Sequence, residues 1–585
     1  MYTLLSSPEP SRFHFHKPEN YISMYHQEGS DTMYVGGQAV IYVLTFLDHT
    51  IFLSLSLSLS LSLSLSQLEC DNFITVIQKV NDTMIVCGTN AGSPRCWMLV
   101  NDTVLTDVQG VQIASASDIS PAYPSQRSIS LPADGSLYSA MSSATGHAGS
   151  IRRTFGSQKL LKTENVWLLN PQFAGAAVIP SDQKLKEEMY FLFSEFNKTA
   201  RVDEEPYRAR IGRVCTVDEG GIKALLADSW TTFMKARVMC GAGNTQQQYN
   251  NLKQAVVLTE QDQRAGVLYG LFSNAWGRKV ICAYSIKDID QAFSTSKLKG
   301  YSSPFIGSRP GTCVRKNSTP GGPSDIKNLG VIRYHPEIED VIRPNGVAPL
   351  DLPTDDQITH MVADIVLAVN DEHYSVLYLG TEQGKVLKVL HFREGVFIIS
   401  QYSLFHNEGP VLNMAVDSQK GHLYIGTAME VQQLPLADCG RYGDTCRECI
   451  LSRDPYCGWD WARRSFCVPT ALKLRRTSPK EVKVQSNTTI FLPCPVRSFH
   501  ATYRWEKDNC LKNYPCILSG DFCVLGPVVD TPLREGIFRC MATEDGFKVE
   551  VISFRLVNNG PFLAASLASS LGLSLLLAVA TLWLH

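Results

Sequence analysis

The sequence predicts a mainly β chain in which a β-propeller is followed by a small disulfide-rich module and a β-sandwich. Three observations support this prediction. Hydrophobic segments that run into a glycine turn recur between Met33 and Leu436, a dense group of cysteines begins at Cys439, and a Cys-Trp-Cys pattern follows near the C-terminus. The length of 585 residues is several times what one core supports, which agrees with more than one domain.

The propeller prediction, for 33–438, rests on a weak internal repeat. Four segments show it: MYVGGQAVIYVL from Met33, MIVCGTN from Met84, VLYLGTEQGKVLKVL from Val376 and HLYIGTAMEVQQLPL from His422. Gly380 and Gly426 are separated by about one blade length, which is roughly 40 to 50 residues in propellers. The polar, glycine-rich stretches near 115–150 and 303–330 are then expected as surface loops. A large β-sandwich is the alternative.

The first 66 residues fit this prediction poorly. Residues 1–32 carry no clear domain signal, and no basic segment followed by an apolar one indicates a signal peptide. Over 53–66 Leu and Ser alternate, as a CT repeat in DNA would encode. We interpret this tract as retained non-coding sequence, which would also account for the missing signal peptide. An amphipathic strand is the alternative.

A cysteine-rich module is predicted for 439–470. Its five cysteines are Cys439, Cys446, Cys449, Cys457 and Cys467, and the last two lie within the segment RDPYCGWDWARRSFC. A module this short buries too little surface to fold by burial alone, so disulfides are expected to restrict its unfolded chain. Cys446 and Cys449 also have the spacing of zinc ligands, but no matching second pair or nearby histidines accompany them.

An immunoglobulin-like domain is predicted for 480–557. Cys494, Trp505 and Cys540 are spaced like the inter-sheet disulfide and buried tryptophan of such a sandwich. Phe538 stands two residues before Cys540, where many of these domains have a tyrosine whose hydroxyl bonds to the backbone. That hydrogen bond is therefore expected to be absent.

Residues 558–585 resemble a removable glycolipid (GPI) anchor signal. From Pro561 to His585 there is no Asp, Glu, Lys or Arg, and no basic flank follows the apolar run. Small residues precede that run and are the candidates for attachment: Asn558, Asn559, Ala564, Ala565 and Ser566. A transmembrane helix is the alternative.

Composition and motifs exclude several classes of protein. With 54 Lys plus Arg against 56 Asp plus Glu, the chain lacks the basic excess of a nucleic-acid-binding protein. No G-x-S-x-G, H-E-x-x-H, Walker or G-x-G-x-x-G motif occurs, so we expect no enzyme, cofactor or metal. His14 and His16 are interpreted as exposed side chains in an unstructured start. Five sequons agree with export, at Asn81, Asn101, Asn197, Asn317 and Asn487.

This order of parts resembles the semaphorin family, and class 7 in particular. The most specific segments are RARIGRVC (208–215), WTTFMKARVMC (230–240), VLYGLFSNAW (267–276) and CRECILSRDPYCGWD (446–460). The last is typical of the plexin-semaphorin-integrin (PSI) module, whereas HATYRW (500–505) and the ending WLH look like class 7. The resemblance covers 67–585, and 33–52 more loosely. It implies a seven-bladed sema propeller, a PSI module, an immunoglobulin-like domain and a GPI anchor on the extracellular face of the plasma membrane.

The resemblance also implies disulfides. The pairs are Cys87 with Cys96, Cys215 with Cys313, Cys240 with Cys282, Cys439 with Cys457, Cys449 with Cys467, Cys494 with Cys540, and Cys510 with Cys516. Cys70, Cys446 and Cys523 are left over. The family partner of Cys70 would lie in the Leu-Ser tract, and that of Cys446 in a linker that is largely missing between Val468 and Lys483.

The function implied by the resemblance is that of a dimeric ligand for a C-class plexin receptor, acting in cell guidance, adhesion, migration and immune regulation. Relatives of class 7 carry an Arg-Gly-Asp integrin-recognition triplet after the cysteine that matches Cys215. Here Thr216, Val217 and Asp218 stand in its place, and we interpret Asp218 as a solvated loop residue. An integrin-binding adhesion ligand and a non-signalling decoy or structural protein are the alternatives.

Overall fold

The structure, a computed structural model, describes the propeller and the C-terminal domain with gaps. The described residues are 4–5, 11–46, 54–56, 72–100, 104–107, 114–142, 148–180, 187–198, 206–241, 249–259, 266–305, 307–313, 323–346, 349–350, 352, 354, 356–392, 395–403, 409–442, 445–459, 467–469, 480–484, 491–495, 502–508, 513–519, 522–525, 536–544 and 547–558.

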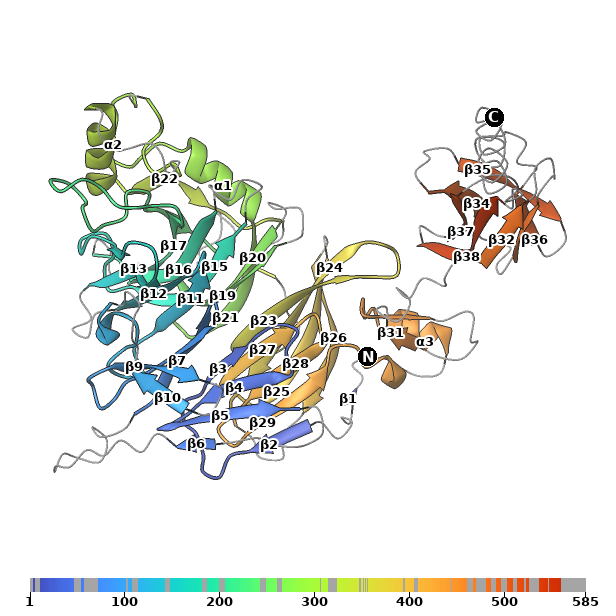
Figure 1. Ribbon diagram of the computed structural model, residues 1–585, viewed down its shortest axis with the longest axis horizontal. Helices are drawn as coiled ribbons and strands as arrows, with labels where there is room; N and C mark the ends of the chain where they lie inside the picture. Colours follow the sequence, from blue (N-terminus) through green and yellow to red (C-terminus); the bar gives the residue numbers. More distant parts are fainter. Residues whose placement is uncertain are drawn as a thin grey trace, which may run out of the picture. The chain divides into compact units, whose positions relative to one another are not determined.

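Within these residues, seven separate sheets form the propeller blades (Figure 1). The first strands of successive blades contact one another, from β27 to β3, β7, β11, β15 and β19, so they line the centre. Seven small sheets in a ring exclude the alternative of a large β-sandwich, and the predicted seven-bladed propeller is confirmed.

The first three blades are four-stranded antiparallel sheets. Their strands are β3 (Ser23–His26), β4 (Thr32–Gly36), β5 (Val40–Thr45) and β6 (Ser54–Ser56); β7 (Ile74–Val80), β8 (Thr83–Gly88), β9 (Arg95–Val100) and β10 (Val104–Asp107); and β11 (Ser128–Ala133), β12 (Ser136–Ser142), β13 (Gly149–Gly156) and β14 (Leu161–Lys162). A short 3-10 helix, η1 (Ala116–Asp118), precedes β11.

The other four blades follow along the chain. Their strands are β15 (Gln172–Ile179), β16 (Glu188–Phe196), β17 (Tyr207–Cys215), β18 (Met234–Val238) and β22 (Glu337–Ile342); β19 (Asn251–Thr259), β20 (Gly266–Ser273) and β21 (Lys279–Ser285); β23 (Ile358–Leu367), β24 (His373–Thr381), β25 (Lys385–Phe392), β26 (Gly395–Ser403) and β1 (Leu4–Leu5); and β27 (Asn413–Asp417), β28 (His422–Gly426), β29 (Glu430–Pro435) and β2 (Ser11–His14).

The N-terminal strands belong to the propeller, so the predicted boundary at residue 33 is wrong. β2 pairs antiparallel with β29, placing Phe13 opposite Val431, and β3 pairs with β4. His14 lies in β2, where its exposed side chain pairs with Glu430 at 3.1 Å, so this start is structured. Strands of four residues carry little periodicity of their own, and the partner of β2 lies at the other end of the domain, which is why the sequence pattern missed them.

The Leu-Ser tract contributes one short strand. β6, Ser54–Ser56, pairs with β5 in the first blade. The strand alternative therefore applies to these three residues, while 57–66 lie outside the described part of the chain.

An insertion follows β21 and carries two helices, α1 (Ile286–Thr295) and α2 (Pro323–Tyr334) (Figure 1). Ser285 caps α1 by accepting a hydrogen bond from the N–H of Asp288. Ile286, Ile289 and Phe293 form its buried face. After α2, strand β22 returns to the preceding blade and pairs parallel with β18. The stretch near 303–330, predicted as a surface loop, thus includes the first part of α2.

The central strands of the blades are buried on both faces because each blade packs between two others. Residues 189–193 of β16, for example, are each at most 1% exposed. In sequence, such strands are continuous runs of hydrophobic residues. They lack the alternation of hydrophobic and polar residues that is typical of a strand with one face exposed to solvent.

The immunoglobulin-like domain is a seven-stranded arrangement with the order β32-β38-β37-β34-β35-β36-β33. Its strands are β32 (Lys480–Val484), β33 (Leu492–Pro495), β34 (Thr502–Lys507), β35 (Asn513–Ser519), β36 (Phe522–Leu525), β37 (Gly536–Glu544) and β38 (Phe547–Asn558). Cys494 is bonded to Cys540, and Trp505 and Phe538 are fully buried. The Cys-Trp-Cys prediction is confirmed.

The residues of the cysteine-rich module divide between two compact units, one ending at Asp454 and one beginning at Pro455. The first unit holds η3 (Cys439–Tyr442) and α3 (Cys446–Leu451), and the second holds the paired strands β30 (Cys457–Trp459) and β31 (Cys467–Pro469). A buried ion pair connects this first part to the propeller, because Lys388 of β25 contacts Asp454 at 2.5 Å. Tyr442 also donates to Asp454, at 2.6 Å.

Four of the predicted disulfides are formed as pairs in the structure. They are Cys87–Cys96, Cys215–Cys313, Cys240–Cys282 and Cys494–Cys540. Cys439, Cys449 and Cys457 are also disulfide-bonded, and their predicted pairing stays a prediction.

The predicted pair Cys510–Cys516 is wrong in this structure, because Cys516 is bonded to Cys523. These two cysteines lie on the adjacent antiparallel strands β35 and β36, with Cα atoms 5.3 Å apart. Cys510 and Cys70 lie outside the described residues.

Candidate functional site

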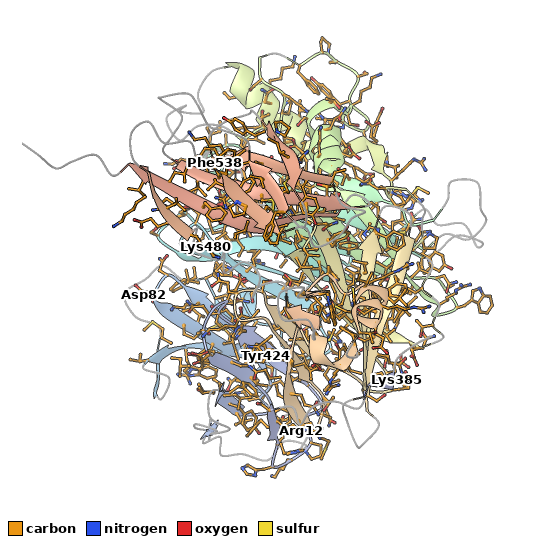
Figure 2. The ribbon with its side chains drawn as sticks, turned by 90° about the vertical axis from the view of Figure 1, so that its right-hand side faces the viewer. Arg12, Asp82, Lys385, Tyr424, Lys480 and Phe538 are labelled. Atoms are coloured by element: carbon orange, nitrogen blue, oxygen red, sulfur yellow. A yellow bond between two sulfur atoms is a disulfide. The ribbon has the colours of Figure 1, made fainter. Side chains whose placement is uncertain are left out.

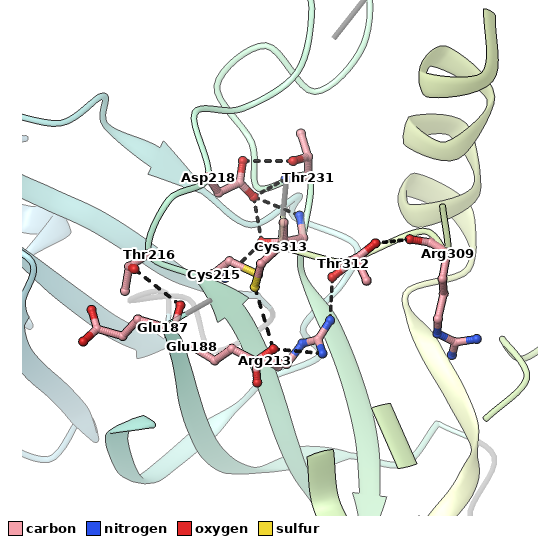
Figure 3. Close-up of a disulfide and its surroundings, with 12 residues drawn as sticks. Glu187, Glu188, Arg213, Cys215, Thr216, Asp218, Thr231, Arg309, Thr312 and Cys313 are labelled. Atoms are coloured by element: carbon pink, nitrogen blue, oxygen red, sulfur yellow. Dashed lines mark hydrogen bonds and ion pairs between the residues drawn. A yellow bond between two sulfur atoms is a disulfide. The ribbon is translucent and has the colours of Figure 1, made fainter. Parts of the chain in front are cut away.

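The degenerate integrin-motif position lies at the end of β17, directly after the Cys215–Cys313 disulfide (Figure 3). β17 is a middle strand of its blade, between β16 and β18. Arg213 of β17 pairs with Glu188 of β16 at 3.2 Å, below the disulfide. Glu188, Cys215 and Cys313 bring ligand-type atoms within 4.8 Å of one another, but the two sulfurs are bonded together and offer no thiolate to a metal.

Asp218 is buried, with 5% of its surface exposed, and accepts five hydrogen bonds. The donors are the Gly220 N–H at 2.8 Å, the Thr231 N–H at 2.7 Å and hydroxyl at 2.9 Å, and the Thr232 N–H at 2.9 Å and hydroxyl at 2.8 Å. The prediction that Asp218 is a solvated loop residue is therefore wrong. The carboxylate holds the turn after β17 against the segment that leads into β18 (Figure 3).

The backbone of the same turn is held by Arg153 of β13. Its guanidinium donates to the carbonyl oxygens of Thr216 at 2.9 Å and Asp218 at 2.6 Å. The Arg153 side chain is buried and lies 5.3 Å from the centre of the Trp230 ring, in cation-π geometry. Thr216 is also buried, and its N–H donates to the Glu187 carbonyl.

These contacts make the 216–218 turn a structural corner. A carboxylate that completes the metal coordination of a receptor has to reach solvent, whereas the Asp218 oxygens are already bonded inside the blade. The sequence missed Arg153, Thr231 and Thr232 as its partners. Thr231 and Thr232 belong to the segment WTTFMKARVMC, but no sequence signal connects them with Asp218, and Arg153 lies in the preceding blade.

A second charged cluster lies in the same blade beside a cavity of about 170 Å³. Glu195 accepts hydrogen bonds from Arg210 at 2.7 Å and from Lys235 at 2.9 Å, and Arg210 also donates to Glu337 at 2.8 Å. Burial lowers the pKa of Lys235, and Glu195 partly offsets this effect. Since these charges neutralise one another, the cluster is consistent with a structural role between β16, β17, β18 and β22.

The sequons have different environments. Asn81 is exposed in the turn between β7 and β8, as the acceptor of a glycan has to be. Asn197 is 6% exposed, which disagrees with a glycan there, because the modified side chain has to reach solvent. Asn101, Asn317 and Asn487 lie outside the described residues.

Of the anchor candidates, Asn558 is the last residue of β38. Asn559, Ala564, Ala565 and Ser566 lie outside the described part of the chain. None of the helices in the described part has the length and apolar character that crossing a membrane requires.

Family models match three parts of the chain. The Sema domain matches residues 252–418, the plexin repeat (PSI) matches 438–495, and the semaphorin-3/4/7A immunoglobulin-like domain matches 476–563. The chain is 30% identical to Semaphorin-7A of Mus musculus over 94% of its own length and 86% of that protein. The chain belongs to the semaphorin family. This match covers nearly the whole chain and confirms the predicted resemblance to class 7.

Solved structures show the same fold. Drosophila Semaphorin 2a matches 96% of this semaphorin with a TM-score of 0.65 and 22% identity, and all of that chain is covered. A structure of Drosophila Plexin A in complex with Semaphorin 1b matches 80% of it with a TM-score of 0.62 and 21% identity, covering 94% of the matched chain. At these identities the likeness establishes the fold alone.

Proposed function

We propose that this semaphorin is an extracellular ligand that binds a C-class plexin receptor through its propeller and acts in cell guidance, adhesion, migration and immune regulation. The observation that carries the proposal is the similarity to Semaphorin-7A along nearly the whole chain. The structure of Plexin A in complex with Semaphorin 1b adds a case in which a semaphorin of this fold forms a complex with a plexin.

The proposed mechanism is recognition without catalysis. Seven blades held by buried strands form a rigid support, and their connecting loops are available to read a partner by shape. We further propose that the ligand is a dimer held at the cell surface by a GPI anchor. Two copies on one surface raise the effective concentration of the second contact, so a weak single contact still gives firm engagement between cells.

The integrin alternative has less support at the predicted position. Asp218, the remaining acidic residue of the triplet position, is buried and bonded to Thr231 and Thr232. An integrin would have to bind another surface of the semaphorin. The decoy alternative predicts a folded chain that binds neither receptor.

The test is binding of a soluble ectodomain, ending at Val557 and given a signal peptide, to cells that display either a C-class plexin or integrins. Matched cells without each receptor are the controls, and a free Arg-Gly-Asp peptide serves as a competitor. We expect saturable binding to the plexin cells that the peptide does not reduce. Binding to integrin cells alone would favour the adhesion alternative, and a folded ectodomain that binds neither would overturn the ligand proposal.

A further inference from the structure

A buried histidine joins the first and last blades of the propeller. His26 is the last residue of β3 and Asp417 the last residue of β27, and these two inner strands contact each other where the ring closes. The His26 Nε2 lies 2.6 Å from Asp417 Oδ2, and the two side chains are 2% and 0% exposed. The Nδ1 of the same ring lies 3.1 Å from the carbonyl oxygen of Thr32.

Both neighbours of the ring are hydrogen-bond acceptors. A backbone carbonyl cannot donate, and an ionised carboxylate cannot donate either. Asp417 also accepts from the N–H of Gly29 at 3.0 Å and of Lys420 at 2.9 Å, which fits a carboxylate. Burial alone would raise the pKa of Asp417, but these bonds and the one from His26 lower it overall.

A neutral imidazole has one N–H and one bare nitrogen, so it can satisfy only one of the two acceptors. We propose that His26 is a doubly protonated imidazolium in the folded semaphorin and that it forms, with Asp417, a pH-sensitive latch between the first and last blades. The centre of the ring also lies 4.7 Å from that of Tyr424, which Figure 2 labels.

The other charged groups near the latch leave this assignment unchanged. Lys420 pairs with Asp31 at 2.8 Å, so these two charges offset each other. Burial lowers the pKa of His422, although Asp417 partly opposes this, so that ring is neutral at pH 7. Lys79 of β7 donates to Gln27, next to His26, and points its charge to solvent. The titratable and charged groups around His26 are Asp31, Lys79, Asp417, Lys420, His422 and Tyr424.

With this latch, the stability of the contact between the first and last blades depends on pH. As pH rises, His26 loses one of its two protons, one of the two hydrogen bonds is lost, and the buried Asp417 charge loses its cationic partner. On the acidic side the limit is set by Asp417, whose pKa in the folded protein is lowered from its ordinary value of 3.8. The stability that its carboxylate contributes is therefore fully present above pH 3.8 and is lost as pH falls through the lower pKa of the folded state. The contact between the first and last blades is therefore expected to be stable at mildly acidic and neutral pH and less stable at alkaline pH.

The direct test is NMR of the full chain labelled with ¹⁵N and ¹³C in histidine. At pH 7.5 we expect protons on both ring nitrogens of His26, with the signal assigned by its loss in His26→Gln. His360 is the matched control, since burial lowers its pKa to about 4 although its Nδ1 bonds to the Val411 carbonyl. It should show a neutral ring. A neutral His26 ring at this pH would overturn the proposal.

A second measurement does not depend on His26→Gln folding. Between about pH 6 and pH 9 the melting temperature should fall more in the wild type than in Asp417→Asn. The asparagine oxygen still accepts a hydrogen bond from a neutral ring, but the side chain has no charge that needs a cationic partner. His16→Gln, at an exposed position, should keep the wild-type slope. Equal slopes in the wild type and Asp417→Asn would contradict the latch.

Discussion

At the scale of single residues, the groups around a charged side chain determine whether it has a structural role or is available to bind a partner. Asp218 accepts five hydrogen bonds inside a blade, although its place after Cys215 resembles a recognition motif. Lys388 and Asp454 form a fully buried ion pair in which burial lowers the pKa of Lys388 and Asp454 partly offsets that effect. Neither environment can be read from the residue type or its neighbours in sequence.

Removing the Asp218 carboxylate should destabilise the propeller strongly. Asp218→Ala leaves the hydroxyl and N–H donors of Thr231 and Thr232 without their acceptor in a buried site, and each donor that finds no other partner costs about 1 to 3 kcal/mol. Asp228→Ala is the control, because Asp228 is exposed and pairs with Lys159 at 3.6 Å. Urea unfolding followed by tryptophan fluorescence measures both. Equal stability of the two variants would show that the Asp218 bonds contribute little.

At the scale of elements, strand pairing determines which cysteines can meet. β35 pairs with β34 on one side and with β36 on the other, and the second pairing brings Cys516 within reach of Cys523. The predicted partner Cys510 is close to Cys516 in sequence, but proximity in sequence says little about which strand edge a side chain faces. The short helices follow local rules more closely: Thr445 and Glu448 form a capping box at the start of α3.

Mass spectrometry of the non-reduced protein tests the pairing. Trypsin should release 513–534, which contains both Cys516 and Cys523, and 508–512, which contains Cys510. We expect the longer peptide to be two hydrogens lighter than its reduced form and not joined to the shorter one. The Cys494–Cys540 pair serves as the internal control. A covalent link between the two peptides would restore the pairing implied by the family.

At the scale of the whole molecule, the propeller is closed by contacts between segments far apart in sequence. β2 completes the last blade beside β29, and Phe13 and Phe15 pack with Tyr42 of the first blade. Val431 and Tyr424 of the last blade share the same core. The two ends of the domain therefore form one hydrophobic cluster, which stabilises the ring against opening between the first and last blades.

Phe13→Ala should weaken this closure. Phe13 is buried, and truncating a buried phenylalanine typically costs about 3 to 5 kcal/mol. His16→Ala, three residues away and exposed, should change stability by less than about 0.5 kcal/mol. Thermal unfolding of the two variants compares them. If Phe13→Ala unfolds at the same temperature as His16→Ala, the N-terminal strand does not contribute to the ring.

Much of the architecture could be predicted because its signals are local. The cysteines of the PSI module, the Cys494-Trp505-Cys540 spacing and each unit of the strand-glycine repeat can be recognised from residue types and their spacing along the chain. The burial of Asp218 by Arg153 and Thr231, the place of β2 beside β29 and the two acceptors around His26 depend on segments meeting in the fold, and the partner of Cys516 depends on the register of two neighbouring strands. Only the folded chain decides these contacts, because strand register and the packing of segments against one another determine which side chains meet, and neither leaves a mark in the local pattern.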